Sequence, residues 1–175
     1  MTNTNDIRVA LTNLGKYNEG ELTYVWLTLP ATSDEIQTAL DEIGINEEYE
    51  EYFISDYEAP FQIGEYESLT RLNEVADELD ELDDYETVAF NAYIDGCSED
   101  VNEALEVAQS GDYVVWDDVE NMEDIAYAMV DEGYFEIDES NILSRYINYE
   151  ALGRDIGFDG TFIFIDGKNC VEFHA

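Results

Sequence analysis

The stretch Leu72-Asn-Glu-Val-Ala-Asp-Glu-Leu-Asp-Glu-Leu-Asp-Asp-Tyr-Glu86 combines the two patterns that define this chain. Apolar side chains recur every three or four residues, which predicts a helix with one buried face: Leu72, Val75, Leu79 and Leu82. Carboxylates recur at the same spacing opposite that face: Glu74, Asp77, Glu78, Glu81 and Asp84. Like charges at this spacing oppose folding by about 0.2–0.5 kcal/mol per pair. We therefore expect a use other than stability to maintain the acidic row.

Upstream of this helix, the sequence predicts a small α+β module. Alternation over Ile7–Thr12 predicts a half-buried strand, and Leu22–Leu29 predicts the returning strand after a turn-rich connection at 15–20. Residues 32–44 predict a helix that begins with a Thr-x-x-Glu capping box and stops at a glycine. A third strand is expected around Tyr52–Tyr57.

Downstream, the periodicity remains helical before strands return. A second helix is expected over 84–96 and a third after Ser98, which could cap it. The β-branched and aromatic run at 113–116 predicts a strand, and further helical segments follow it. Residues 161–165 and 170–173, joined by an Asp-Gly-Lys-Asn turn, predict a hairpin.

The fold class is therefore α+β, in three small modules. The predicted boundaries are 1–62 for an N-terminal α+β module, 63–108 for a helical middle and 109–175 for a C-terminal α+β module. Charge repulsion favours an elongated arrangement of these modules. Duplex DNA carries about one charge per 1.7 Å of axis, so 38 charges correspond to roughly 65 Å of duplex.

The charge balance limits the partners. Six Lys+Arg stand against 44 Asp+Glu, a net charge of -38, yet 45% of residues are apolar and 13% aromatic, which is enough to build cores. A nucleic acid or a membrane surface would repel the chain, so its partner should be basic. The sequence shows no apolar run long enough to cross a membrane, and two unpaired cysteines suit a reducing cytosol. We expect a cytoplasmic protein.

Carboxylates also crowd two regions outside the helical row. One group surrounds the third predicted strand: Glu47, Glu48, Glu50, Glu51 and Asp56. The other lies in the last module: Asp117, Asp118, Glu120, Glu123, Asp124, Asp131 and Glu132. Any one group could be an ordinary solvated face. Solubility needs a net charge of only about 2–8 for a small domain, so their recurrence favours a surface that imitates phosphates.

Metal binding, catalysis and salt adaptation are the alternatives. Residues 155–166 approximate an EF-hand loop, but Gly157 stands at a ligand position and Asp166 replaces the bidentate Glu. His174 and Cys170 lie in one predicted strand, about 13 Å apart at 3.3 Å per residue. We predict no metal, no cofactor and no catalytic residue. Halophilic proteins also carry acidic coats, and a folding test at low salt separates that explanation.

Three blocks of the sequence resemble the ArdA antirestriction proteins, in order over nearly the whole chain. The blocks are Val9–Leu22 followed by Trp26 and Pro30, Asn46–Phe61, and Tyr146–Asp155 followed by Gly160–Phe162. The resemblance implies three domains in a curved, elongated shape, paired as a homodimer through the C-terminal domain. It also implies mimicry of bent duplex DNA that blocks the DNA groove of type I restriction-modification enzymes and protects mobile genetic elements.

The resemblance carries over no catalytic residue. It includes the motif Gly153-Arg154-Asp155, which we expect to serve the C-terminal fold or the dimer contact rather than the charge. As a rare cation, Arg154 should pair with a nearby carboxylate. The alternative function is a decoy or regulator of another basic DNA-binding protein.

Overall fold

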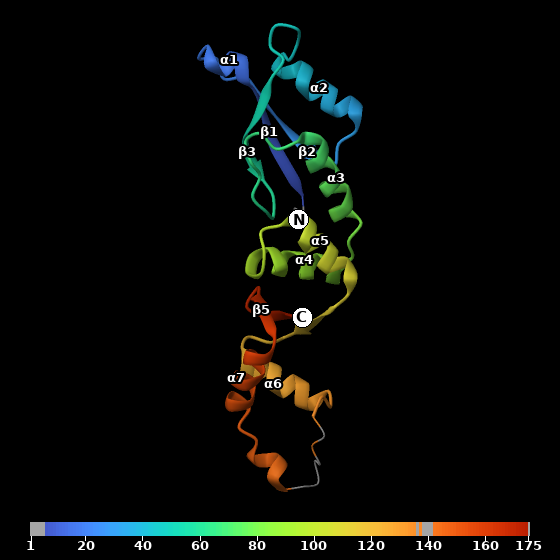
Figure 1. Cartoon of the computed structure of the whole chain (residues 1–175), viewed down its shortest axis with the longest axis vertical. Coiled ribbons are helices and arrows are strands. Elements are labelled where there is room, and N and C mark those ends of the chain that lie inside the picture. Colours follow the sequence, from blue (N-terminus) through green and yellow to red (C-terminus); the bar gives the residue numbers. More distant parts are fainter. Residues whose placement is uncertain (1–5, 136, 138–141, 175) are drawn as a thin grey trace. The chain divides into compact units, whose positions relative to one another are not determined.

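The computed structural model describes residues 6–135, 137 and 142–174. The chain divides into two compact units, Met1–Asp83 and Asp84–Ala175, each built around a three-stranded antiparallel sheet (Figure 1). The predicted α+β class is confirmed. The division into three modules stays a prediction. None of the helices in the described part of the chain has the length and hydropathy needed to cross a membrane.

The first sheet has the order β2-β1-β3, with β1 (Ile7–Asn13) between β2 (Tyr24–Leu29) and β3 (Tyr52–Glu58). The prediction that β1 is half-buried was wrong, because only Arg8 along it is not buried. A central strand is covered by its neighbours on both sides. The small side chains of Ala10 and Thr12 are therefore buried even on the face away from the helices.

The predicted turn at 15–20 is instead largely a short helix, α1 (Leu14–Asn18). Asn13 caps it, since its side-chain oxygen accepts a hydrogen bond from the backbone N–H of Lys16 at 3.0 Å. The Asn13 amide also donates to the carbonyl of Ile43 at 3.1 Å. One buried side chain thus begins α1 and ties the end of the next helix to β1.

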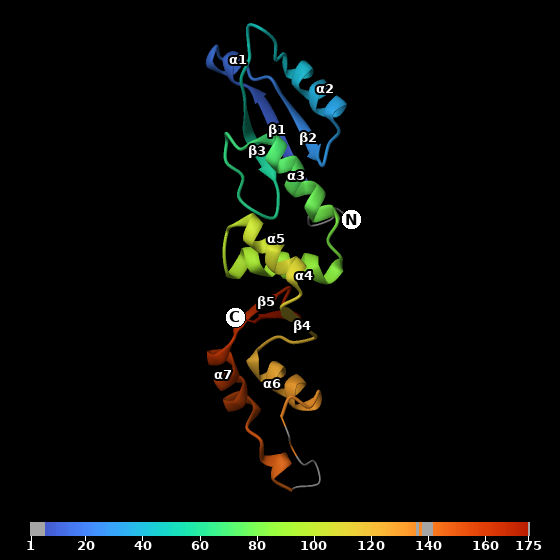
Figure 2. The same ribbon diagram turned by 45° about the vertical axis from the view of Figure 1, so that its right-hand side comes forward.

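Two longer helices cover one face of this sheet (Figures 1 and 2). The predicted capping box of α2 (Ser33–Ile43) is confirmed: Thr32 and Glu35 satisfy each other's backbone N–H groups, and Gly44 ends the helix at φ 80°. Helix α3 (Leu69–Asp80) follows a Ser68 cap and buries Leu72, Val75 and Leu79 of the predicted apolar face, whereas Leu82 lies beyond the end of the helix and is half-buried.

The second unit has three layers. Its sheet has the order β4-β6-β5: β4 (Tyr113–Asp117), β6 (Asn169–Phe173) and β5 (Thr161–Ile165), so the predicted hairpin is confirmed. Helices α4 (Asp84–Gly96) and α5 (Val101–Ser110) lie on one side, and α6 (Met122–Asp131) and α7 (Tyr149–Asp159) on the other. A 3-10 helix, η1 (Ile142–Tyr146), precedes α7.

Contacts between the sheet and the helices on each side fix these layers. Trp116 and Cys170 face the core formed with Ile125 and Met129 of α6. On the opposite face, Phe173 meets the ring of Tyr93 in α4 edge-on, with ring centroids 5.3 Å apart.

The predicted cap of α5 was wrong by two residues. Asp100, rather than Ser98, accepts the backbone N–H groups of Asn102 and Glu103. The Ser98 hydroxyl instead accepts the backbone N–H of Asp100 at 3.2 Å. Either residue type can cap a helix, and the carboxylate adds a favourable interaction with the helix dipole.

Candidate functional site

The acidic row predicted on α3 lies where its spacing placed it, opposite the buried apolar face. Glu74, Asp77 and Glu81 are exposed, and Glu78 is half-buried. The row is not free of cations, since Arg71 contacts Glu74 at 3.4 Å and Glu78 at 3.5 Å. Exposed ion pairs of this kind contribute about 0.2–1 kcal/mol, so Arg71 offsets part of the repulsion within the row.

Asp84 is not part of this helix. Helix α3 ends at Asp80, and Asp84 begins α4 in the other compact unit. There it lies in the first turn, where the helix dipole favours a negative charge by about 0.3–1 kcal/mol. The spacing of the acidic row continued past the end of α3, although the sequence also predicted a second helix that begins at residue 84, and that start is confirmed.

Most of the second acidic group lies in a turn before β3 rather than on that strand. Asp56 is on β3, and Glu47, Glu48, Glu50 and Glu51 precede it, which agrees with a group predicted to surround the strand. The Asn46 side chain accepts the backbone N–H groups of Glu48 at 2.8 Å and Tyr49 at 3.1 Å, which shapes the turn.

Tyr49 anchors this turn to α1. Its ring lies against Gly15, where a Cβ atom would come within 2.4 Å of the ring, and its hydroxyl donates to Glu19 at 3.0 Å. That hydrogen bond and the surrounding carboxylates raise the pKa of the Tyr49 phenol above its usual value. A shallow hollow of about 320 Å³ lies beside the turn, with Gly15, Tyr49 and the four glutamates around it.

In the second unit, the acids of the third group lie at the end of β4 and at the two ends of α6. Asp117 ends β4, Asp118 has a positive φ of 57°, and both are exposed, as are Glu120 and Glu123. Asp124 has a local role instead. Its carboxylate accepts the backbone N–H of Glu120 at 2.9 Å and so helps to fix the start of α6.

Asp131 and Glu132 lie at the C-terminal end of α6, both exposed. The negative end of the helix dipole repels anions there by about 0.3–1 kcal/mol each. No described residue in the last turn of α6 is basic. These two carboxylates therefore carry a stability cost from their position.

The sequence-based set omits exposed carboxylates that the structure places on other helices. Helix α2 exposes Asp34, Asp41 and Glu42, and α5 exposes Glu103 and Glu106. The sequence of α5 contains a pattern that could have identified its acids. The two acids are three residues apart, and Ala104, Leu105 and Ala108 are buried on the other side of the helix.

The calcium interpretation fails on secondary structure. Residues 155–159 form the end of α7 and residues 161–165 form β5, so no continuous loop exists to surround an ion. Among the residues that the structure describes, no three His, Cys, Asp or Glu side chains gather closely enough to hold a metal. Burial raises the pKa of the Cys170 thiol to about 12, which keeps it protonated and unreactive at neutral pH.

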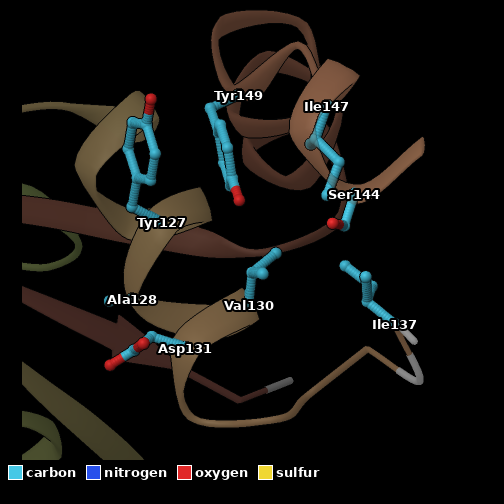
Figure 3. A pocket seen from close by; sticks show the side chains of 8 residues that line it. All are labelled: Tyr127, Ala128, Val130, Asp131, Ile137, Ser144, Ile147 and Tyr149. Atoms are coloured by element: carbon cyan, nitrogen blue, oxygen red, sulfur yellow. The ribbon is translucent and has the colours of Figure 1, made fainter. Parts of the chain in front are cut away.

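A separate hollow of about 480 Å³ lies between α6, η1 and α7 (Figure 3). The rings of Tyr127 and Tyr149 stack at its edge, with centroids 3.7 Å apart. Ser144 faces the hollow, whereas Asp131 points away from it in the view shown. Among the described residues, the lining combines apolar side chains with the hydroxyls of Tyr127, Ser144 and Tyr149, and no base lies beside a nucleophile there.

The motif Gly153-Arg154-Asp155 divides into two roles. Gly153 is buried where α7 crosses the start of α6, and a Cβ atom there would lie 2.1 Å from the backbone oxygen of Met122. The expected pairing of Arg154 is confirmed, since its guanidinium lies 3.5 Å from the carboxylate of Asp155. Gly153 thus serves the packing of the C-terminal fold.

The fold and this surface define a class: a strongly anionic α+β protein that displays carboxylates on two compact, well-packed units. Over residues 9–170 the sequence matches the family described as Antirestriction protein (ArdA). The chain belongs to this family of antirestriction proteins, which are inhibitors rather than enzymes. A search of curated proteins found no match.

Proposed function

We propose that this antirestriction protein is a DNA mimic that occupies the DNA-binding groove of type I restriction-modification enzymes. The observation that carries the proposal is the exposure of the carboxylates. Of the seventeen acidic residues predicted for the surface, all but Glu78 and Asp124 are exposed. They extend from helices and turns that are held by buried cores, so an anionic surface is available without a folding step.

The mechanism is competitive. Lys and Arg side chains that normally contact phosphates pair instead with carboxylates, and both partners release their counterions, so affinity should fall steeply with salt. Phosphate contacts carry no sequence information. Inhibition should therefore extend across enzymes with different recognition sequences, and modification should be blocked wherever methylation uses the same groove.

We further propose that two copies pair through the C-terminal module, residues 109–175. Like charges would keep two such chains apart unless apolar contact offsets the repulsion. Among the exposed large apolar side chains in the described part of this module, the three most exposed could supply it: Ile142, Tyr146 and Phe158. An elongated dimer in the cytoplasm could extend the anionic surface along the length of a bound duplex, to the benefit of a mobile element entering a new host.

Competition for a labelled duplex tests the proposal. A purified type I enzyme, its site-bearing duplex and this protein are titrated over a series of salt concentrations. We expect full displacement of the duplex, with a linear fall of log affinity against log salt. Unchanged affinity from low to high salt would exclude the mechanism. Displacement from another basic DNA-binding protein, but not from the type I enzyme, would favour the alternative decoy function.

Two matched triple variants locate the surface. One removes three charges from the α3 row and its cap: Glu74→Gln, Asp77→Asn and Glu81→Gln. The control removes three exposed charges from α2: Asp34→Asn, Asp41→Asn and Glu42→Gln. Both change the net charge equally, so a larger loss of inhibition from the first set assigns the α3 row to the contact surface. Equal losses would show that only total charge matters.

A further inference from the structure

The sheet of the first unit has one face that α2 and α3 do not cover. Side chains alternate across β1, and the bond from Asn13 to Ile43 places α2 on the odd-numbered side. Leu27 and Leu29 of β2 are buried on that side, whereas Tyr24 is 52% exposed on the other. Figures 1 and 2 show both helices on the same side of the sheet.

The uncovered side, called the open face below, is defined by the cross-strand register. It consists of three rows: Thr28–Arg8–Glu58, Trp26–Ala10–Asp56 and Tyr24–Thr12–Phe53. The middle residues of the last two rows are small and buried, so the larger side chains beside them form most of the surface.

Aromatic rings dominate one end of the open face. The Tyr17 ring of α1 meets Phe53 edge-on, with centroids 5.3 Å apart, and is itself 53% exposed. Tyr24 is exposed on the outer strand of the sheet, and Trp26 is half-buried beside it. Exposed aromatic patches on a single chain mark interaction surfaces, and Tyr and Trp are enriched among the residues that dominate binding energy.

Arg8 shows which chemistry this face accepts. Its guanidinium carbon lies 5.2 Å from the centre of the Trp26 ring, and its Nη1 donates to the Glu58 carboxylate at 2.6 Å. A guanidinium thus already lies between a ring and a carboxylate. In the next row Asp56 is exposed, and no Lys or Arg of the described chain pairs with it.

We propose that the open face is a docking surface for a basic protein surface, that of the restriction enzyme in the proposed function on which this inference rests. Aromatic rings such as Tyr24 cover the apolar stems and guanidinium groups of arginine side chains. Asp56 pairs with their charge. The net charge of -38 excludes nucleic acid as the occupant. The aromatic rings of the open face therefore add a contact that depends little on salt to the charge-driven binding of the carboxylates, Asp56 included.

The salt dependence of binding separates this contact from charge. The affinity of the full chain for a purified type I restriction enzyme is measured over a salt series for wild type, Tyr24→Ser, Tyr24→Phe and Asp56→Asn. Tyr24→Ser should weaken binding by about three- to tenfold at every salt concentration, with the slope unchanged. Tyr24→Phe keeps the ring and should bind as wild type. Asp56→Asn should reduce the slope by about one.

The failure of this inference differs from the failure of the proposed function. Wild-type affinity and slope for Tyr24→Ser would overturn the docking surface and leave the DNA mimic intact. A wild type that does not bind the enzyme would overturn both. If Tyr24→Ser lowers the melting temperature, Tyr17→Ser provides the same comparison from α1. A change in the dimer equilibrium of Tyr24→Ser, measured by sedimentation, would assign the face to a second copy of the chain and overturn the enzyme as its occupant.

Discussion

Gly153 lies where helix α7 packs against the start of α6, and replacing it with alanine should destabilise the second unit. The added Cβ would lie 2.1 Å from the Met122 oxygen, 2.5 Å from the Met122 carbonyl carbon and 3.0 Å from the Glu123 nitrogen. All three are backbone atoms at the start of α6, so no side chain can rotate away. The two helices must separate instead.

The magnitude follows from two opposing terms. Overpacking costs about 1–3 kcal/mol, and this site belongs at or above the upper end because the contact is with backbone. Alanine in place of glycine within a helix stabilises the folded state by about 1 kcal/mol. A net loss of about 2 kcal/mol should lower the melting temperature of a unit of this size by roughly 8–16 °C.

Gly157, one turn later in α7, is the matched control. Its added Cβ would lie 3.5 Å from the Met122 side chain, an ordinary contact. Gly157→Ala should therefore stabilise the protein by about 0.5–1 kcal/mol through helix propensity alone. Both variants are compared with wild type by circular dichroism, in thermal and urea unfolding at one protein concentration. A Gly153→Ala protein that melts at or above the wild-type temperature would refute the close approach of the helices.

Three further predictions test separate features. Glu132→Lys should raise stability by about 0.3–1 kcal/mol, because a cation suits the C-terminal end of α6, and should weaken inhibition; a lower melting temperature would contradict the dipole argument. Thr32→Ala should cost about 0.5–2 kcal/mol in urea unfolding at neutral pH. Since the Thr32 backbone N–H and hydroxyl lower the pKa of Glu35 from 4.5, the stabilisation they provide is present above that value and is lost as pH falls through the lower folded pKa. Alanine keeps the backbone N–H at position 32, so only the contribution of the hydroxyl separates the two proteins. The stability gap between wild type and Thr32→Ala should therefore narrow in acid, and a constant gap would argue against the hydrogen bond from the Thr32 hydroxyl to Glu35. A thiol reagent should modify exposed Cys97 in the native protein and buried Cys170 only after unfolding; two fast native thiols would show that the second core is open.

Features set by neighbouring residues could be predicted from the sequence. The capping box of α2 and its terminal glycine depend on contacts within one helix, and the turn between β5 and β6 depends on four residues. The apolar face of α3 was predicted for the same reason, since its period alone identifies the buried side.

Features set by distant residues could not be predicted. The burial of Thr12 depends on the order β2-β1-β3, which local alternation does not encode. The buried Asn13 joins β1 to the end of α2, thirty residues away. The acidic surface was predicted in composition and in part of its placement. The row on α3 follows from its spacing, whereas the shape of the turn before β3 is set by contacts of Asn46 and Tyr49 that no spacing encodes. The sequence identified Gly153 as part of a motif. Its close approach to Met122 could not be predicted, because it depends on how α7 packs against α6.

Each compact unit contains one of the two tryptophans, in a different environment. Trp26 is partly exposed beneath the Arg8 guanidinium, whereas Trp116 is buried next to Tyr134 and donates its indole N–H to Glu172 at 3.0 Å. Their fluorescence should differ in colour and in accessibility to a quencher, so each half of the molecule carries its own optical reporter. Whether the two units unfold together or one after the other can therefore be observed by fluorescence in the unlabelled natural chain.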